Sequence, residues 1–201
     1  MRSFPNPSGA ARRHRRNPHP PMALKSAVFK ADLSVADLDR NYYADHALTL
    51  ARHPSETDER MMVRLAAFAL QADPALTFCK GLSDADEPDL WRKDLTGAIE
   101  SWIEVGLPDE RRIARASGRA ARVRVYAYGS AVDPWWKPLA GKLERFRNVE
   151  VLRLPAQQTR ALAALARRTM RLQCTVQDGH LWITDGEASV QVEPEILFGD
   201  R

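Results

Sequence analysis

Three acidic residues are spaced so that they could hold a divalent cation. Asp89 lies where a short strand is expected to begin, and Glu104 lies near the end of the next strand, residues 98–105. Glu59 continues the apolar line of a helix expected over residues 56–72. Mg²⁺ and Mn²⁺ favour carboxylate oxygens, and such a metal activates water when a phosphodiester is hydrolysed. We therefore predict Glu59, Asp89 and Glu104 to be catalytic acids and metal ligands.

Each of these acids also has an ordinary structural explanation. Asp89 follows a proline and fits a turn or a cap, Glu104 could pair with Arg112 or Arg115, and Glu59 could accept from a backbone amide. Acids are common, so each match by itself is weak. The prediction depends on their joint arrangement.

Hydrophobic periodicity and turn residues indicate the elements that would position the acids. Ser55 with Asp58 resembles a capping box for the helix over 56–72, and Glu56 is expected to face solvent. The strands are expected at 24–33, 42–50, 75–80, 88–91, 98–105, 122–128 and 149–154, with further helices at 108–118, 133–146 and 157–168 and three short strands at the end. This order predicts a single α/β domain with a small mixed sheet flanked by helices, an N-terminal hairpin and a C-terminal β-meander.

The net charge of +4 comes from the first 21 residues. That segment holds five arginines and no acid, so the remainder balances 25 − 26 = −1. Rich in proline and poor in apolar side chains, residues 1–21 are expected to be a disordered extension, although a basic arm for nucleic acid is the alternative. Residues 22–201 are expected to form the folded domain, whose charge indicates neither presence nor absence of a polyanionic partner.

The cysteines and the hydropathy of the chain predict its cellular compartment. Cys79 and Cys174 belong to no CxxC pair, which is typical of reduced thiols and favours the cytoplasm. No run of 18 apolar residues is present, so we expect no membrane-spanning segment. Motifs of kinases, dinucleotide-binding proteins, serine hydrolases and zincins are also missing from the sequence.

Two groups of side chains that contain aromatic residues could either contact nucleic acid or pack in the hydrophobic core. Trp135 and Trp136 share helical spacing with Leu139 and Leu143, which favours core packing over base stacking. Four side chains alternate on one face of the strand at 122–128: Arg122, Arg124, Tyr126 and Tyr128. That face could be a nucleic-acid surface or a sheet face covered by a helix, and both interpretations stand.

Four longer segments carry a resemblance to a known family. They are LARHPSETDERMMVRLAAFA at 50–69, KGLSDADEPDLW at 80–91, WIEVGLPDERRI at 102–113 and TMRLQCTVQDG at 169–179. With the opening at 22–43, the chain resembles the YaeQ family of bacterial proteins over about residues 22–195. The resemblance implies a compact variant of the PD-(D/E)xK nuclease fold, whose core order of helix, three strands, helix and strand matches the order predicted from Ser55 onward.

The sequence departs from the nuclease pattern at one position. That pattern has a lysine two residues after the second acid, where this chain has Gly106. The resemblance therefore implies a displaced basic group, for which Lys80 and Arg112 are the candidates. Arginine stabilises negative charge but cannot act as a base at ordinary pH.

Two functions follow from these patterns. The first is a phosphodiesterase or nuclease that depends on Mg²⁺ or Mn²⁺ and acts on nucleic acid. The alternative is a non-catalytic nuclease-fold module that binds nucleic acid or a protein partner. Gly106 is the strongest support for the alternative.

Overall fold

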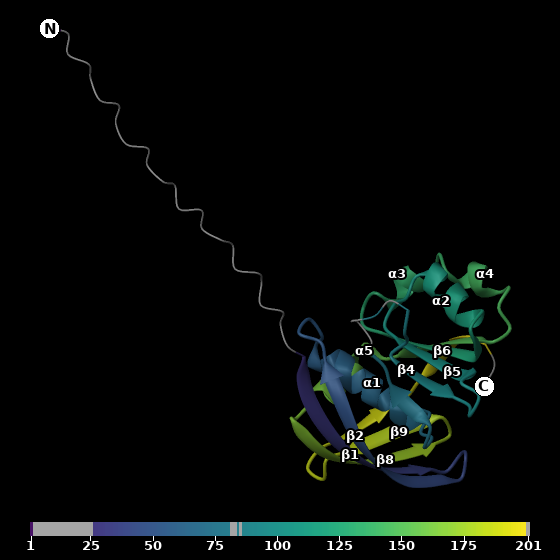
Figure 1. Ribbon diagram of the computed structural model, residues 1–201. Coiled ribbons are helices and arrows are strands. Elements are labelled where there is room, and N and C mark those ends of the chain that lie inside the picture. The colour runs from purple at the N-terminus through teal and green to yellow at the C-terminus, as the bar shows by residue number, and fades with distance from the viewer. Residues whose placement is uncertain (2–25, 81–83, 85, 200–201) are drawn as a thin grey trace.

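The computed structural model describes Met1, residues 26–80, Asp84 and residues 86–199. Apart from Met1, the predicted extension at 1–21 lies outside the described residues. In this part of the chain the domain has two mixed sheets and five helices, arranged as in Figure 1. The prediction of one sheet was therefore too simple, whereas the mixed α/β class is confirmed.

The first sheet unites the two ends of the chain. Its order is β10-β9-β8-β1-β2, and β1 runs parallel to β8 although both belong to antiparallel hairpins. The bounds are β1 Ala27–Asp37, β2 Tyr42–Arg52, β8 Thr169–Gln177, β9 His180–Thr184 and β10 Ser189–Val192. The predicted N-terminal hairpin and C-terminal meander thus form one sheet together.

The second sheet carries the predicted acids. Its order is β11-β7-β6-β5-β4-β3, with β5, β6 and β7 parallel and the outer strands antiparallel. The bounds are β3 Leu76–Phe78, β4 Leu90–Lys93, β5 Ile99–Val105, β6 Ala120–Tyr128, β7 Val149–Leu154 and β11 Glu195–Phe198. Four strands follow the helix at Ala156–Ala163, and β11 is the fourth, whereas three short strands were predicted.

The helices lie on both sides of the second sheet. They are α1 Asp58–Leu70, α2 Glu110–Ser117, α3 Val132–Trp136, α4 Ala140–Leu143 and α5 Ala156–Ala163. α1 lies between the two sheets, while α2, α3 and α4 cover the other face of the second sheet (Figure 1). The helix expected over 133–146 is therefore two short helices.

The two layers have separate hydrophobic cores. The larger core surrounds α1, whose residues from Met61 to Leu70 are all buried. The smaller core packs Trp102 and Ile113 against Val123 and Leu143. Trp135 and Trp136 pack against the smaller core, which confirms the interpretation of these residues as packing side chains.

Candidate functional site

Asp89 lies just before β4, at the end of the sheet where β5 finishes. Its backbone N–H donates to Ile103 O over 3.0 Å, and its side-chain Oδ2 accepts from the backbone N–H of Val105 over 2.8 Å. The other carboxylate oxygen, Oδ1, accepts from Arg60 Nη2 over 2.7 Å. The carboxylate thus extends the β4–β5 pairing through its side chain, and only 1% of the residue is exposed.

Glu104 lies one residue before the end of β5, on the face covered by α2. Its Oε1 accepts from Trp102 Nε1 over 2.7 Å and from Arg112 Nε over 2.8 Å. Burial raises the pKa of Glu104; the bonds from Trp102 and Arg112 oppose this rise, and the charge of Asp89 adds to it. Asp89 and Glu104 therefore share one end of the sheet, as their positions in the sequence predict. Their role as metal ligands stays a prediction.

Glu59 points to another element. Its Oε1 accepts from the hydroxyl of Thr159 in α5 over 2.7 Å, rather than from a backbone amide. Because α1 and Glu104 lie on opposite faces of the second sheet, Glu59 and Glu104 approach it from different sides. Burial raises the pKa of the Tyr128 hydroxyl, the charge of Arg60 opposes this rise, and the charges of Glu59, Glu56 and Asp89 add to it.

Glu56, which was expected to face solvent, is only 6% exposed. It lies just before α1, and the Arg60 side chain links it to Asp89. Arg60 donates through Nη1 to Glu56 Oε1 over 2.9 Å and through Nη2 to Asp89. Arg64 donates to both oxygens of Glu56, over 2.8 and 2.9 Å. The expected cap was also wrong. Thr57, not Ser55, is the N-cap of α1, and its hydroxyl accepts from the backbone N–H of Arg60.

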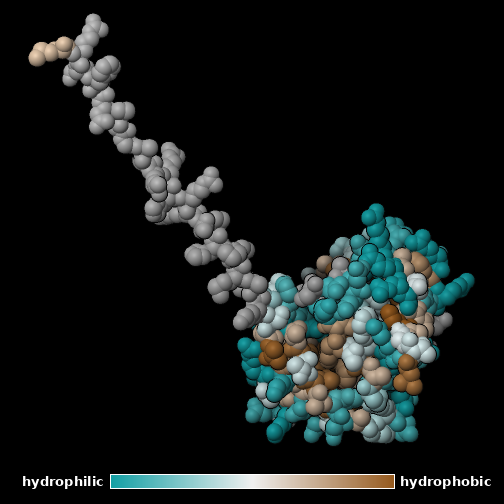
Figure 2. All heavy atoms as spheres, viewed as in Figure 1, coloured by the Kyte–Doolittle hydropathy of each residue, from teal (hydrophilic) through white to brown (hydrophobic). Residues whose placement is uncertain are grey.

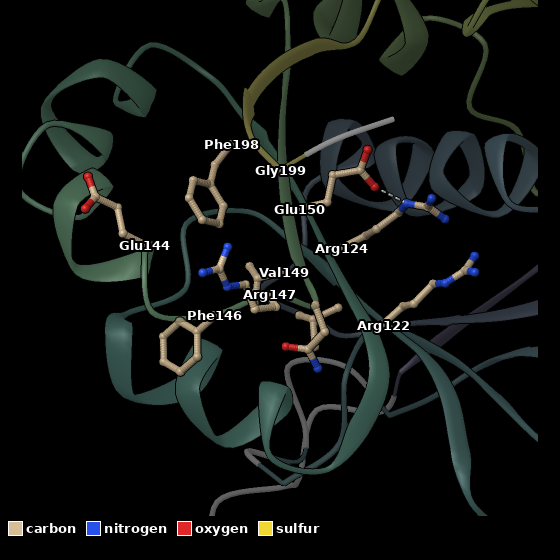
Figure 3. Close-up of a pocket in the computed structure, with 11 residues that line it drawn as sticks. Arg122, Arg124, Glu144, Phe146, Arg147, Val149, Glu150, Phe198 and Gly199 are labelled. Atoms are coloured by element: carbon tan, nitrogen blue, oxygen red, sulfur yellow. Dashed lines mark hydrogen bonds and ion pairs between the residues drawn. The ribbon is translucent and has the colours of Figure 1, made fainter.

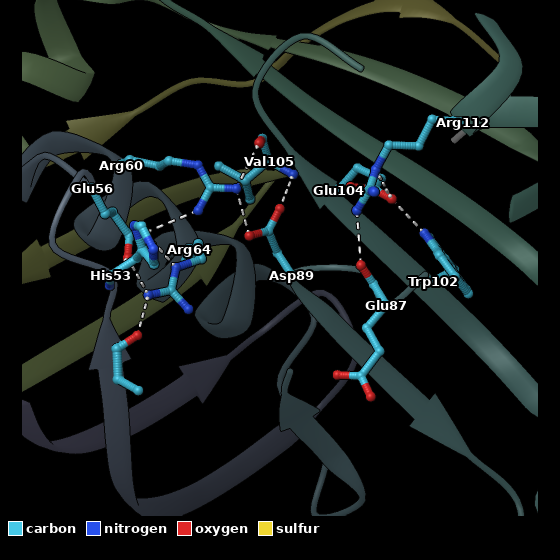
Figure 4. A network of polar contacts seen from close by, with 11 residues as sticks. His53, Glu56, Arg60, Arg64, Glu87, Asp89, Trp102, Glu104, Val105 and Arg112 are labelled. Carbon is cyan, nitrogen blue, oxygen red and sulfur yellow. Dashed lines mark hydrogen bonds and ion pairs between the residues drawn. The ribbon is translucent and has the colours of Figure 1, made fainter. Parts of the chain in front are cut away.

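Arg60 and Arg64 are site residues that the sequence reasoning missed, although one signal was available. Arg64 stands inside the apolar run of α1 and is 2% exposed, and a buried guanidinium requires a buried acid. Residues three or four apart on a helix are neighbours, so Glu56 and Arg60 are matched by spacing. Figure 4 shows Glu56, Arg60, Arg64 and Asp89 joined in one network that reaches the end of β5 at Val105.

The two predicted basic groups have different environments. Arg112 contacts Glu104 and also donates through Nη2 to Glu87 O over 2.8 Å. The Lys80 side chain is 67% exposed, and its Nζ lies 3.7 Å from Asp84 and 3.9 Å from Glu87 instead of at Asp89 or Glu104. Of the two candidates, only Arg112 reaches the acids.

The backbone conformation explains why Gly106 occupies the position where the nuclease pattern has lysine. Gly106 has φ +113°, a left-handed conformation that side chains rarely adopt, and its N–H donates to Tyr126 O over 3.0 Å. This conformation ends β5 and turns the chain toward α2. A lysine here would be strained, so the turn itself disfavours the usual basic residue.

The buried carboxylates at this end of the sheet are each paired with arginine. Three carboxylates, of Glu56, Asp89 and Glu104, face three guanidinium groups, of Arg60, Arg64 and Arg112. A divalent cation added to this arrangement would leave two uncompensated positive charges, unless an arginine moved away. Within the described ranges, no three histidine, cysteine, aspartate or glutamate side chains are grouped as metal donors. Asp89 and Glu104 could therefore hold a metal ion only if an arginine moved away from its carboxylate.

The face carrying Arg122, Arg124, Tyr126 and Tyr128 has a covered end and an open end. Gln71, at the end of α1, donates to the Tyr126 hydroxyl over 3.0 Å, so a helix covers that part. Arg124 pairs with Glu150, whereas Arg122 is exposed (Figure 3). Beside them is a cavity of about 570 Å³, which is also lined by Phe146, Arg147 and Phe198 and by two acids, Glu144 and Glu150. Arg122 and Arg147 form no ion pair with any described residue.

Two further expectations concern the cysteines and the membrane. Cys79 and Cys174 are both free thiols, and burial raises the pKa of each to about 12. None of the helices in the described residues is long and apolar enough to cross a membrane.

Comparison with known proteins points to one family throughout. The family model described as "YaeQ protein" matches residues 22–194. A Salmonella typhi protein called "Uncharacterized protein YaeQ" is 48% identical, covering 86% of this chain and 96% of the relative, and its Escherichia coli counterpart is also 48% identical, covering 85% and 95%. The crystal structure of the YaeQ protein from Xanthomonas axonopodis pv. citri superposes with a TM-score of 0.84 at 48% identity, covering 87% and 99%. That from Pseudomonas syringae gives 0.84 at 37% identity, covering 87% and 97%.

Proposed function

The chain belongs to the YaeQ family, and from this premise we propose that it is a non-catalytic module with a nuclease-like fold, which binds nucleic acid without hydrolysing it. One observation carries the proposal: the three buried carboxylates at the end of β5 are balanced by three arginines. In a nuclease, such acids would carry excess negative charge that recruits a cation. Here that charge is already neutralised within the chain.

Burial supports the same conclusion. Asp89 is 1% exposed and Glu104 is 3% exposed, so a phosphodiester cannot touch either carboxylate without displacing protein groups. Gly106 further leaves the position of the usual lysine without a side chain. The network of Glu56, Arg60 and Asp89 instead ties α1 to the β4–β5 pair. We assign it the role of fixing the fold.

Nucleic acid is the partner that the open basic face supports. Arg122 and Arg147 are exposed, and neither is committed to an acid among the described residues. Phe146 and Phe198 line the same cavity and lie near Arg147, whereas the Arg122 side chain extends to the other side (Figure 3). Guanidinium groups contact phosphates and aromatic rings stack on bases in proteins that bind single strands.

The test is a fluorescence-anisotropy titration of a labelled single-stranded oligonucleotide, with and without a chelator. We expect binding that the chelator does not change and that weakens with salt. Arg122→Ala and Arg147→Ala should each lower the salt slope by about 1. Arg111→Ala is the matched control, because Arg111 is exposed on α2 and does not line the cavity. Equal loss in the control, or no binding by the wild type, would contradict the proposal.

A second candidate is hydrolysis dependent on Mg²⁺ or Mn²⁺. Its support is that Asp89 and Glu104 lie at the same end of the sheet: burial raises the pKa of Glu104, and the charge of Asp89 adds to this rise. When bound, the metal would supply activated water and charge neutralisation, and Asp89 and Glu104 would hold it. Arg60 would keep Glu56 as a partner, and Arg112 would face the negative charge of the phosphate.

Cleavage assays separate the two candidates. The oligonucleotide is incubated with Mg²⁺ or Mn²⁺ and the wild-type protein, Asp89→Asn or Glu104→Gln, and each folded variant is verified by circular dichroism. The proposed module leaves the oligonucleotide intact in every sample. Cleavage by the wild type that disappears in both folded variants would establish the second candidate instead.

A further inference from the structure

The free edge of the first sheet is long and regular. β2 is 11 residues long and ends the sheet order, so among the described residues no strand pairs with its outer side. Its pairing with β1 runs without a register shift from Arg52 to Tyr42. Such an edge presents unpaired N–H and C=O groups to an extended chain of suitable pattern. The exception along β2 is Ala51, whose C=O accepts from Arg64 Nη2 over 3.2 Å.

β2 lacks most devices that usually protect an edge strand. It contains no proline, lysine or glycine, and the ladder to β1 has no bulge. The only acid along it is Asp45, which accepts from the Ser34 hydroxyl over 2.5 Å. Natural proteins usually block a long flat edge with charge, proline or a bulge, unless the edge has a partner.

The burial of β2 is also incomplete on its inner face. In β1, Phe29, Ala31, Leu33 and Val35 point inward and are all buried. In β2, most of the inward residues are only half-buried: Tyr42, Ala44, His46 and Leu48. β1 has a strand on each side whereas β2 has one, so an added strand would complete this layer. Figure 2 shows hydrophobic atoms gathered in the region where Figure 1 places α1 and β2.

The side chains of β2 are complementary to a second copy of β2. In a two-fold antiparallel pairing centred on Ala47, all eleven residues have a partner and each keeps its own face of the sheet. Asp45 then faces Thr49 of the other copy, and Tyr42 faces Arg52. No two like charges are opposite each other. An isologous contact of this kind closes and does not propagate into a fibre.

From these observations we propose that two copies of this chain associate through β2, which joins their five-stranded sheets into one continuous sheet across a two-fold axis at Ala47. The contact is independent of the acids at the end of β5 and of the arginines around the cavity. It would bury the half-exposed inner side chains of both copies and pair their free backbone groups.

The test uses charge placed on the axis of the full-length chain. Ala47 is exposed and lies opposite Asp32 of β1, so Ala47→Lys suits the fold and places two lysines opposite each other across the axis. Ala47→Glu places two glutamates there but also faces Asp32 of its own copy, so its folding is verified by circular dichroism. The dimer dissociation constant, measured by sedimentation and by light scattering over a concentration series, should weaken about 2- to 5-fold for one like-charged pair. Ala47→Glu should weaken it more, because Asp45 of the other copy lies diagonally across.

A mixture and a control keep the test specific. Mixing Ala47→Lys with Ala47→Glu should restore dimer above the level of either variant alone, since lysine then faces glutamate. Ala51→Lys is the matched control, because its lysine faces Val28 of its own β1 and Tyr43 of the other copy, places no like charges opposite each other and should not weaken association. A wild type that stays monomeric at every concentration would overturn the proposal, as would a mixture with no more dimer than its components.

Discussion

Arg60 Nη2 and Asp89 Oδ1 lie 2.7 Å apart, although 29 positions separate the two residues in the chain. The same guanidinium contacts Glu56 on its own side and Val105 O at the end of β5. One arginine therefore joins the start of α1 to the β4–β5 pair. Burial opposes the charged form of Arg60, but Asp89 and Glu56 together raise its pKa, so it stays charged.

Removing the charge of Asp89 should destabilise the fold. Asp89→Asn weakens the bond to Arg60 inside a buried network, and breaking such a pair costs roughly 3–5 kcal/mol. The measurement is the free energy of unfolding in urea. Asp86→Asn is the control, because Asp86 pairs with Arg115 at the exposed surface, where a pair contributes about 0–1 kcal/mol. Equal costs for the two variants would contradict the buried-network interpretation.

Glu56 and Arg64 should behave as a coupled pair. Glu56→Gln and Arg64→Met each leave a buried charge with fewer partners, so each should lower the free energy of unfolding by several kcal/mol, roughly 3–5. The double variant removes both charges and should cost less than the sum of the two. The double-mutant cycle should give a coupling energy of about 0.5–3 kcal/mol. Additive costs would show that the two groups do not interact.

The titration of Glu104 should appear in the pH dependence of stability. Burial raises its pKa above the ordinary 4.5, so the folded state binds more protons than the unfolded state in the window that begins at 4.5. The contribution of Glu104 to the free energy of unfolding therefore falls as the pH rises through this window. Glu104→Gln removes the titration.

The check is urea unfolding of wild type and Glu104→Gln from about pH 4 to about pH 7. The free energy of unfolding of the wild type minus that of Glu104→Gln should decrease as the pH rises. A difference that increases with pH would mean that Arg112 and Trp102 outweigh burial at this carboxylate.

Gly106→Lys should not restore a nuclease site without cost. It returns the lysine of the nuclease pattern, but φ +113° strains any side chain, at about 1–3 kcal/mol. Gly106→Ala is the matched control and should lose a similar amount of stability, because the space around the position is open and only the backbone is limiting. A lysine variant as stable as wild type would refute the backbone explanation for this glycine.

The two thiols should be unreactive in the folded protein. With a pKa raised to about 12 by burial, Cys79 has a thiolate fraction of roughly 1 in 10,000 at pH 8. Cys174, which is buried and has the same pKa, should behave alike. Labelling with a chromogenic disulfide should be slow for both thiols and complete after unfolding in urea. Rapid labelling of Cys79 in the native protein would contradict this expectation.

The sequence by itself determined the elements and the location of two acids. Local signals act over short distances, so the strand pattern around Glu104, the Gly118 stop of α2 and the turn at Asp178 were all readable from residue types. The positions of Asp89 and Glu104 at one end of the sheet followed from their places on neighbouring strands. The family resemblance was available for the same reason, since its motifs are continuous in the chain.

Only the tertiary structure decided how the charges are compensated and how the sheets divide. The partners of Asp89 and Glu59 come from α1 and α5, far away in sequence, so neither local spacing nor periodicity could identify Arg60 or Thr159. β1 and β8 join through parallel pairing between opposite ends of the chain, which turns two predicted additions into one sheet. Such contacts depend on which faces remain to be buried after the local elements have formed, and that is a property of the whole fold.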